Sequence, residues 1–92
     1  MHLHIQNTSI LIINTLTKVY ETGVHFERFR SCQAWISEPI FNSAYNITFR
    51  LIKSYNTIVG FINLDNGEYI ELGKWSRTTS KQVTQIYNFM FS

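Results

Sequence analysis

Three histidines are the first residues of this chain whose type suggests chemistry: His2, His4 and His25. His2 and His4 stand two positions apart, so a strand would place both imidazoles on one face, where they could begin a metal site. No Cys, Asp or Glu lies near this pair in the sequence to complete a ligand set. We therefore predict no metal and no cofactor, with the pair on a solvated N-terminal edge.

Nucleophiles and carboxylates do not combine into a catalytic set. The chain has no Gly-x-Ser-x-Gly turn and no phosphate-binding loop, and its one cysteine, Cys32, has no histidine placed to activate it. Asp65 and Glu68 flank a predicted turn, where acidic residues are common. No two carboxylates pair as acid and base: Glu21, Glu27, Glu38, Asp65, Glu68 and Glu71. We predict that the protein is not an enzyme.

The cations form the more informative group, because Lys74, Arg77 and Lys81 fall within eight positions. Trp75 stands among them, and hydroxyls follow at Ser76, Thr78, Thr79 and Ser80. A helix that begins here would offer amide groups and cations to an anion, and the aromatic ring could stack on a base. The same residues also fit a protein-binding surface, or a capped helix with a solvated basic rim and Trp75 in the core.

The elements that must position these residues are clearest in the second half of the chain. Alternating apolar residues predict strands over 45–53, 57–64 and 69–75. The dipeptide Asn66-Gly67 predicts a two-residue type I′ turn between the last two, which would pair Phe61 with Leu72 and Ile58 with Trp75. Both faces of this hairpin carry apolar residues, so one face would take a helix and the other the N-terminal segment or a partner. Gly60 would lie opposite Gly73, leaving a bare spot that a large side chain or a backbone could approach.

The chain is predicted to end in an amphipathic helix over 79–91. Its apolar stripe comprises Val83, Ile86, Tyr87 and Met90. Thr79 and Gln82 match a capping box at its start, with Thr78 or Ser76 as alternative caps.

The first half is harder to interpret. Residues 1–7 alternate like a short strand, and 9–21 fit a helix capped by Thr8 or Ser9, although their β-branched residues also favour a strand. The segment 24–37 begins like a strand and continues as a loop or a short helix. The chain should become extended near Glu38-Pro39.

Composition limits the class of protein. The 92 residues form one domain, and 45% hydrophobic with 15% charged residues predicts a folded chain. The net charge of +2 is lower than that of a dedicated nucleic-acid binder. A single cysteine and the lack of a signal peptide or membrane span favour a reducing cytosol. The predicted fold is α+β: a small antiparallel sheet of three or more strands, with the C-terminal helix packed on one face.

The stretch from Ser54 to Phe91 resembles a family of small, uncharacterised proteins of bacteriophages and mobile elements. The shared elements are Ser-Tyr-x-Thr at 54–57, a hairpin, and aromatic-Ser-x-Thr-Thr-x-Lys at 75–81, opening a final helix. Relatives often have His where this chain has Gln82, so any chemistry of that His would be missing here. The resemblance implies a phage origin and the host cytoplasm, but it supplies no activity.

Three functions follow as hypotheses. By analogy with small phage proteins, the first is an inhibitor that binds a host protein or ribonucleoprotein complex of a defence system, such as a CRISPR-Cas effector. Its predicted contact residues are Tyr55, Lys74, Arg77 and Lys81. The second is a nucleic-acid-binding accessory protein that uses the basic patch. The third, a small hydrolase or transferase, lacks a visible catalytic set.

Overall fold

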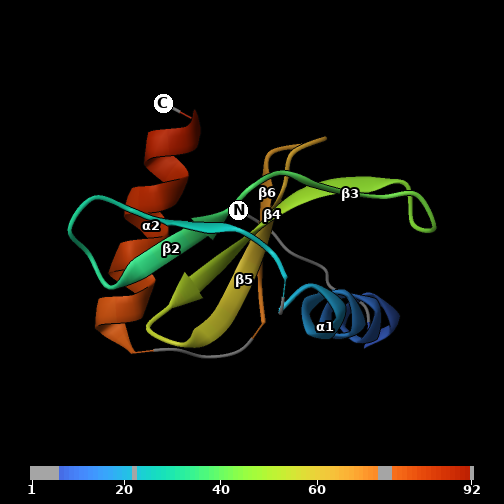
Figure 1. Ribbon diagram of the computed structural model, residues 1–92, viewed down its shortest axis with the longest axis horizontal. Helices are drawn as coiled ribbons and strands as arrows, with labels where there is room; N and C mark the ends of the chain where they lie inside the picture. The colour runs from blue at the N-terminus through green and yellow to red at the C-terminus, as the bar shows by residue number, and fades with distance from the viewer. Residues whose placement is uncertain (1–6, 22, 73–75, 92) are drawn as a thin grey trace.

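The computed structural model describes residues 7–21, 23–72 and 76–91 as a sheet between two helices (Figure 1). The predicted strand 1–7 and its histidines therefore lie outside the described residues, apart from residue 7, as do Lys74 and Trp75. The elements in chain order are α1 (Asn7–Tyr20), β1 (Phe26–Arg28), β2 (Ala34–Ser37), β3 (Ile40–Asn42), β4 (Ile47–Ser54), β5 (Thr57–Asn63), β6 (Glu68–Glu71) and α2 (Arg77–Phe91).

The sheet is antiparallel, in the order β1-β2-β4-β5-β6, with β3 also paired to β4. β2 and β3 follow the same side of β4 one after the other, and Glu38-Pro39 separates them. At this break the hydroxyl of Ser37 accepts a hydrogen bond from the Leu51 amide at 2.7 Å, and Arg50 Nε donates to the Ser37 carbonyl at 2.9 Å. A side chain thus replaces backbone pairing where the proline interrupts the strand.

The β5–β6 hairpin corrects the predicted turn. Its loop has four residues, 64–67, and only Gly67 has a positive φ, 74°, although a type I′ turn needs one at both central positions. Phe61 faces Ile70 rather than Leu72, so the register differs by two residues. An even shift leaves the side chains from Phe61 onward on their predicted faces, because sides alternate with a period of two. Ile58 is the exception: it was predicted on the face of Ile62, but it packs with Phe61 on the other face.

A bulge interrupts the pairing of β4 with β5. Ile52 faces Gly60 and Lys53 faces Ile58, so Val59 has no opposite residue on β4. The expected bare spot at Gly60 is present, and the ring of Tyr69 fills it so closely that any side chain at Gly60 would collide with that ring. The predicted pairing with Gly73 is wrong, because Gly60 faces Glu71.

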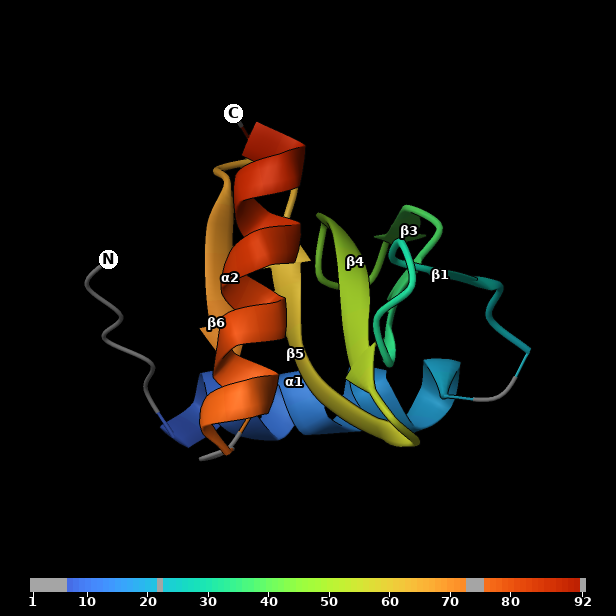
Figure 2. The ribbon, with the colours of Figure 1, turned by 90° about the vertical axis from the view of Figure 1, so that its left-hand side faces the viewer.

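Each face of the sheet is covered by one helix, which confirms the α+β prediction. Figure 2 shows α2 upright on one side and α1 lying crosswise on the other. Tyr69, Val83 and Ile86 belong to the core cluster on the α2 side, while Leu16 and Phe49 belong to the cluster on the α1 side. The predicted stripe on the last helix is confirmed, since Val83 and Ile86 are buried and Tyr87 and Met90 pack against them.

The N-terminal half holds the larger departures from prediction. A helix does form, and it spans Asn7–Tyr20, so the described helix already includes Thr8 and Ser9. The apolar spacing of this segment predicts a buried face that includes Leu16 and Val19, but of these two only Leu16 is buried and Val19 is exposed. The segment 34–37 forms β2 rather than a loop or short helix; it has only four residues, too few for a clear periodic pattern.

Candidate binding surface

The β4–β5 turn and the start of α2 meet at one end of the molecule (Figures 1 and 2). Ser54, which ends β4, lies with its hydroxyl 3.2 Å from that of Thr79 and donates to Gln82 Oε1 at 2.9 Å. Ser76 donates to the Thr79 hydroxyl at 3.3 Å. Each hydroxyl has one proton, so the bonds must run in one direction, from Ser76 to Thr79 to Ser54 to Gln82.

This hydroxyl chain joins the two sequence elements singled out above, 54–57 and 75–81. The predicted pair between Ile58 and Trp75 would make these two elements neighbours in space. That pair lies outside the described residues. Ser54 makes the observed contact, with Thr79 and Gln82. The helix cap is Ser76, one of the alternatives, because its hydroxyl accepts the Thr79 amide at 3.2 Å. The capping box from Thr79 to Gln82 is wrong, since both side chains bond to Ser54.

Tyr55 occupies the first position of the two-residue turn that follows. Its φ is 54°, a left-handed conformation that is uncommon for a bulky residue. Its amide donates to the carbonyl of Gln33 at 2.9 Å, which fixes the turn to the loop between β1 and β2. This backbone hydrogen bond does not bury the side chain, since 56% of Tyr55 is exposed.

Two of the predicted cations lie on the first turns of α2, where helical spacing places both on the face opposite Thr79 and Ile86. Arg77 and Lys81 are exposed, and the first turn of α2 has no acidic residue. Cations at the positive end of a helix dipole are unfavourable for the helix, so they are not explained by helix stability. We call Tyr55, Arg77 and Lys81, together with the hydroxyl chain that joins the turn to α2, the Tyr55 junction.

A second polar surface was missed by the sequence analysis. Arg28, Trp35 and Lys53 are directly in register across β1, β2 and β4. The Arg28 guanidinium and the Lys53 ammonium each lie 5.7 Å from the centre of the Trp35 ring. The three residues are far apart in sequence, and only the register of the unpredicted strand β2 brings them together.

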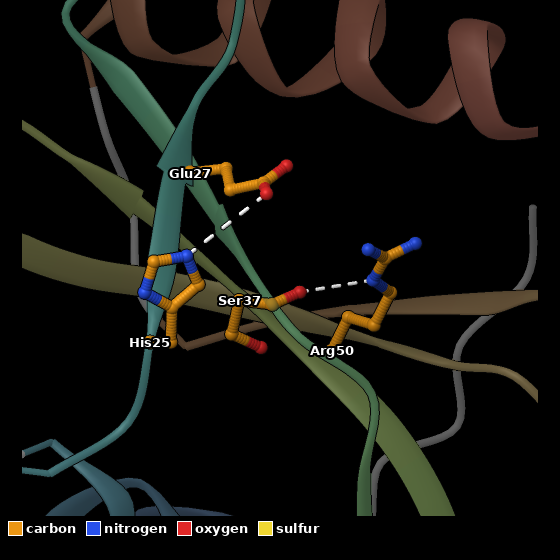
Figure 3. A network of polar contacts seen from close by, with 4 residues as sticks. All are labelled: His25, Glu27, Ser37 and Arg50. Atoms are coloured by element: carbon orange, nitrogen blue, oxygen red, sulfur yellow. Dashed lines mark hydrogen bonds and ion pairs between the residues drawn. The ribbon is translucent and has the colours of Figure 1, made fainter.

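Serine, histidine and glutamate also gather on β1 and β2, but they do not form a catalytic set (Figure 3). His25 lies 3.9 Å from Glu27, and both side chains are well exposed. The Ser37 hydroxyl is buried and donates to the Glu38 carbonyl, so its proton is not directed to His25. Among the described residues, no group of His, Cys, Asp and Glu could hold a metal ion.

Among the described residues, the one strongly shifted pKa belongs to a structural residue. Burial, and to a lesser degree the negative charge of Glu71, raise the pKa of Tyr69 well above its usual range. Its hydroxyl faces the Val59 carbonyl at 3.5 Å beneath α2. In the part of the chain that the structure describes, no helix has the length and apolar character to cross a membrane.

Comparison with known proteins places the chain in one family. The model of a family of unknown function, DUF8033, matches residues 6–90, so the chain belongs to this family. No curated protein and no solved structure matches it. The family match includes every strand and all of α2 but its last residue, and with them the whole Tyr55 junction.

Proposed function

We propose that this DUF8033 member is a non-enzymatic inhibitor of a host defence system. It binds a protein surface of a host complex, for instance a CRISPR-Cas effector, through the Tyr55 junction. The resemblance to phage and mobile-element proteins supports this setting, and with it the host cytoplasm. Small phage proteins of this kind commonly act by occupying a host protein rather than by catalysis.

Tyr55 is the observation that carries the proposal. A non-glycine residue in the left-handed region costs about 1 kcal/mol or more, and a glycine would remove that cost. Tyr55 has φ 54° and a largely exposed side chain, so the fold gains little burial in return. Strain that local packing does not repay is a sign of function.

The surroundings of Tyr55 suit an interface that is formed before binding. Its amide is bonded to Gln33, and the preceding Ser54 is bonded to Thr79 and Gln82. The turn is thus held against α2, and less conformational entropy is lost when a partner binds. Tyrosine and arginine are also frequent anchors of protein interfaces, because they bury large areas or make forked hydrogen bonds.

A plaque assay tests the proposal. Cells with CRISPR-Cas immunity against a test phage would express either the wild-type protein or the double variant Tyr55→Ala/Lys81→Ala. We expect the wild type to restore plating of the phage and the variant to lose most of that effect. The matched control is Tyr45→Ala/Lys18→Ala, which removes the same residue types from exposed positions elsewhere.

Two results would overturn the proposal. One is a wild-type protein that restores plating against none of a panel of CRISPR-Cas and other defence systems. The other is a control variant as defective as the junction variant, with both folded as judged by circular dichroism.

Nucleic-acid binding by the start of α2 is the second candidate. Arg77 and Lys81 are exposed and no acidic residue balances them in the first helical turn, which favours contact with phosphates. Binding led by phosphates weakens by orders of magnitude between low and physiological salt, whereas a protein interface depends much less on salt. A steep salt dependence that Arg77→Ala/Lys81→Ala flattens would favour this candidate over the first.

A further inference from the structure

The row formed by Arg28, Trp35 and Lys53 has the form of a binding surface, and we call it the Trp35 row. An aromatic ring stands between two cations on adjacent strands, each 5.7 Å from its centre. Strands in a sheet lie about 4.8 Å apart, so the strands that carry the two cations are separated by roughly 10 Å. Trp35 is half-buried, and among the described residues it belongs to neither core cluster.

Both cations are held in place before any ligand arrives. Arg28 Nε donates to the Cys32 carbonyl at 2.7 Å, and its Nη2 donates to the Ser31 carbonyl at 3.4 Å. These bonds leave the other N–H groups of the guanidinium for an external acceptor. The Lys53 ammonium lies 4.3 Å from the centre of the Phe26 ring, which restricts its position in the same way.

The charge of this face is uniformly positive along the three strands. Phe26 and Leu51, the neighbours of the row on the same face of β1 and β4, are apolar. The acidic residue of β1, Glu27, alternates to the opposite face, where it lies near His25 (Figure 3). An anionic ligand at the row would therefore meet two cations and no carboxylate from these strands.

We propose that the Trp35 row binds single-stranded nucleic acid. One base stacks on Trp35 in place of the Lys53 ammonium, which lies over the ring in the free protein. The phosphates on either side of the base then contact Arg28 and the displaced Lys53. An unpaired base can present its flat face to an aromatic ring, whereas the bases of a duplex are already stacked on each other. With only two cations in the row, we expect dissociation constants of roughly 1–100 µM at physiological salt, the range of sequence-independent binding.

This proposal does not depend on the inhibitor function. The Trp35 row lies on the α1 side of the sheet, whereas the contacts of Ser54 with Thr79 and Gln82 lie on the α2 side. An acidic peptide would match the charges of the row, but it would not use the aromatic ring. The ring between the cations favours a ligand that carries flat groups and negative charges in alternation.

Fluorescence anisotropy with labelled ten-nucleotide strands of DNA and RNA tests the proposal, at several salt concentrations. Removing both cations in Arg28→Gln/Lys53→Gln should weaken binding at least about tenfold and reduce the log–log salt slope by about 1.4, which corresponds to two lost phosphate contacts. Trp35→Leu should weaken binding about fivefold or more and leave the salt slope unchanged, because stacking releases no counterions. Lys18→Gln, an exposed cation on α1, is the control and should bind like the wild type.

Three outcomes would overturn the proposal. The first is no binding of either strand at low salt. The second is equally tight binding of a ten-residue glutamate peptide or of a duplex, which would show a surface that does not use the ring. The third is a larger loss in Arg77→Ala/Lys81→Ala than in Arg28→Gln/Lys53→Gln, which would move the nucleic acid to the start of α2. The preference between the DNA and RNA strands identifies which of them the row binds.

Discussion

The two turns that flank β5 are both held by α2, yet they are built differently. The β5–β6 turn closes mainly with its own groups. The side-chain oxygens of Asn63 and Asn66 accept hydrogen bonds from the backbone amides of Asp65 and Glu68, and the Gly67 amide donates to the Asn63 carbonyl. Leu64 and Asp65 also form hydrogen bonds with the backbone of Thr48 on β4. Gly67 takes the positive φ, as its type favours. Tyr87 then binds the finished turn, donating to the Gly67 carbonyl at 2.6 Å.

The β4–β5 turn depends on the rest of the protein instead. Its positive φ falls on Tyr55, and its bonds come from outside the turn, from Gln33 and from the hydroxyl chain of α2. The first turn has residues that suit its conformation, so it needs no explanation beyond the fold. The second keeps an unsuitable residue in an exposed position, and this is why we assign it a function.

The largest expected effect is on the helix that holds both turns. Ile86 is fully buried in the middle of the α2 contact, so Ile86→Ala should lower the free energy of unfolding by about 2–5 kcal/mol. Urea denaturation measures this loss. Gln85→Ala, an exposed position on the same helix, should change stability by less than about 0.5 kcal/mol. If Ile86→Ala and Gln85→Ala lowered the free energy of unfolding equally, α2 would not be the element that joins the turns.

A smaller effect is expected when Gly67 of the β5–β6 turn is replaced by a residue that strains the backbone, as Tyr55 does in the β4–β5 turn. Gly67→Val should cost about 1–2 kcal/mol, because a β-branched residue is placed at a φ of 74°. A new Cβ would lie 3.6 Å from Phe91, an ordinary contact distance, so the cost comes from the backbone. Gly67→Asn, which tolerates this conformation, is the control. An unchanged melting temperature in the valine variant would remove the contrast between the turns.

The same turn shows what the sequence could and could not predict. The period of two placed the apolar residues from Phe61 to Leu72 on their correct faces, because burial depends on that alternation. It misplaced Ile58, since the bulge at Val59 interrupts the alternation in β5. The register depends on the length of the loop. Asn66-Gly67 is typical of a two-residue turn. Here the side-chain oxygen of Asn66 accepts a hydrogen bond from the Glu68 backbone amide, within a four-residue loop. Asn66-Gly67 can close either a two-residue turn or a four-residue loop, and this ambiguity accounts for the error in the predicted register.

The candidate surfaces were predictable to the extent that they are local. Tyr55, Arg77 and Lys81 could be found because they lie near the two recurring elements, and Ser54 does join those elements in space. The Trp35 row could not be found, since Arg28, Trp35 and Lys53 come from three strands, one of which was not predicted. The left-handed φ of Tyr55 had no sequence signal either, because Gly or Asn is the usual residue there.

The pH dependence of stability offers a third test of the β5–β6 hairpin. Tyr69 follows its turn, and burial holds the pKa of Tyr69 above that of an unfolded tyrosine, which is about 10. Above that pH the unfolded chain loses the proton while the folded one keeps it, so stability falls as pH rises. From pH 10 to 11 the wild type should lose about 1 kcal/mol more than Tyr69→Phe. Parallel curves for the two proteins would mean that Tyr69 ionises freely in the folded state.

The smallest expected effect has the opposite sign and separates strain from function. Tyr55→Gly should raise the free energy of unfolding by about 0.5 kcal/mol, because relief of the left-handed strain slightly exceeds the entropy that glycine adds to the unfolded chain. Thermal melts measure the gain. Tyr55→Ala keeps the strain and should show none, while both variants should lose inhibition in the plaque assay because both lack the aromatic ring. A more stable protein that is less active would mean that Tyr55 is kept for binding. If Tyr55→Gly instead destabilised the fold by 1 kcal/mol or so, the ring would be a packing residue, and the two turns would differ only in how they are closed.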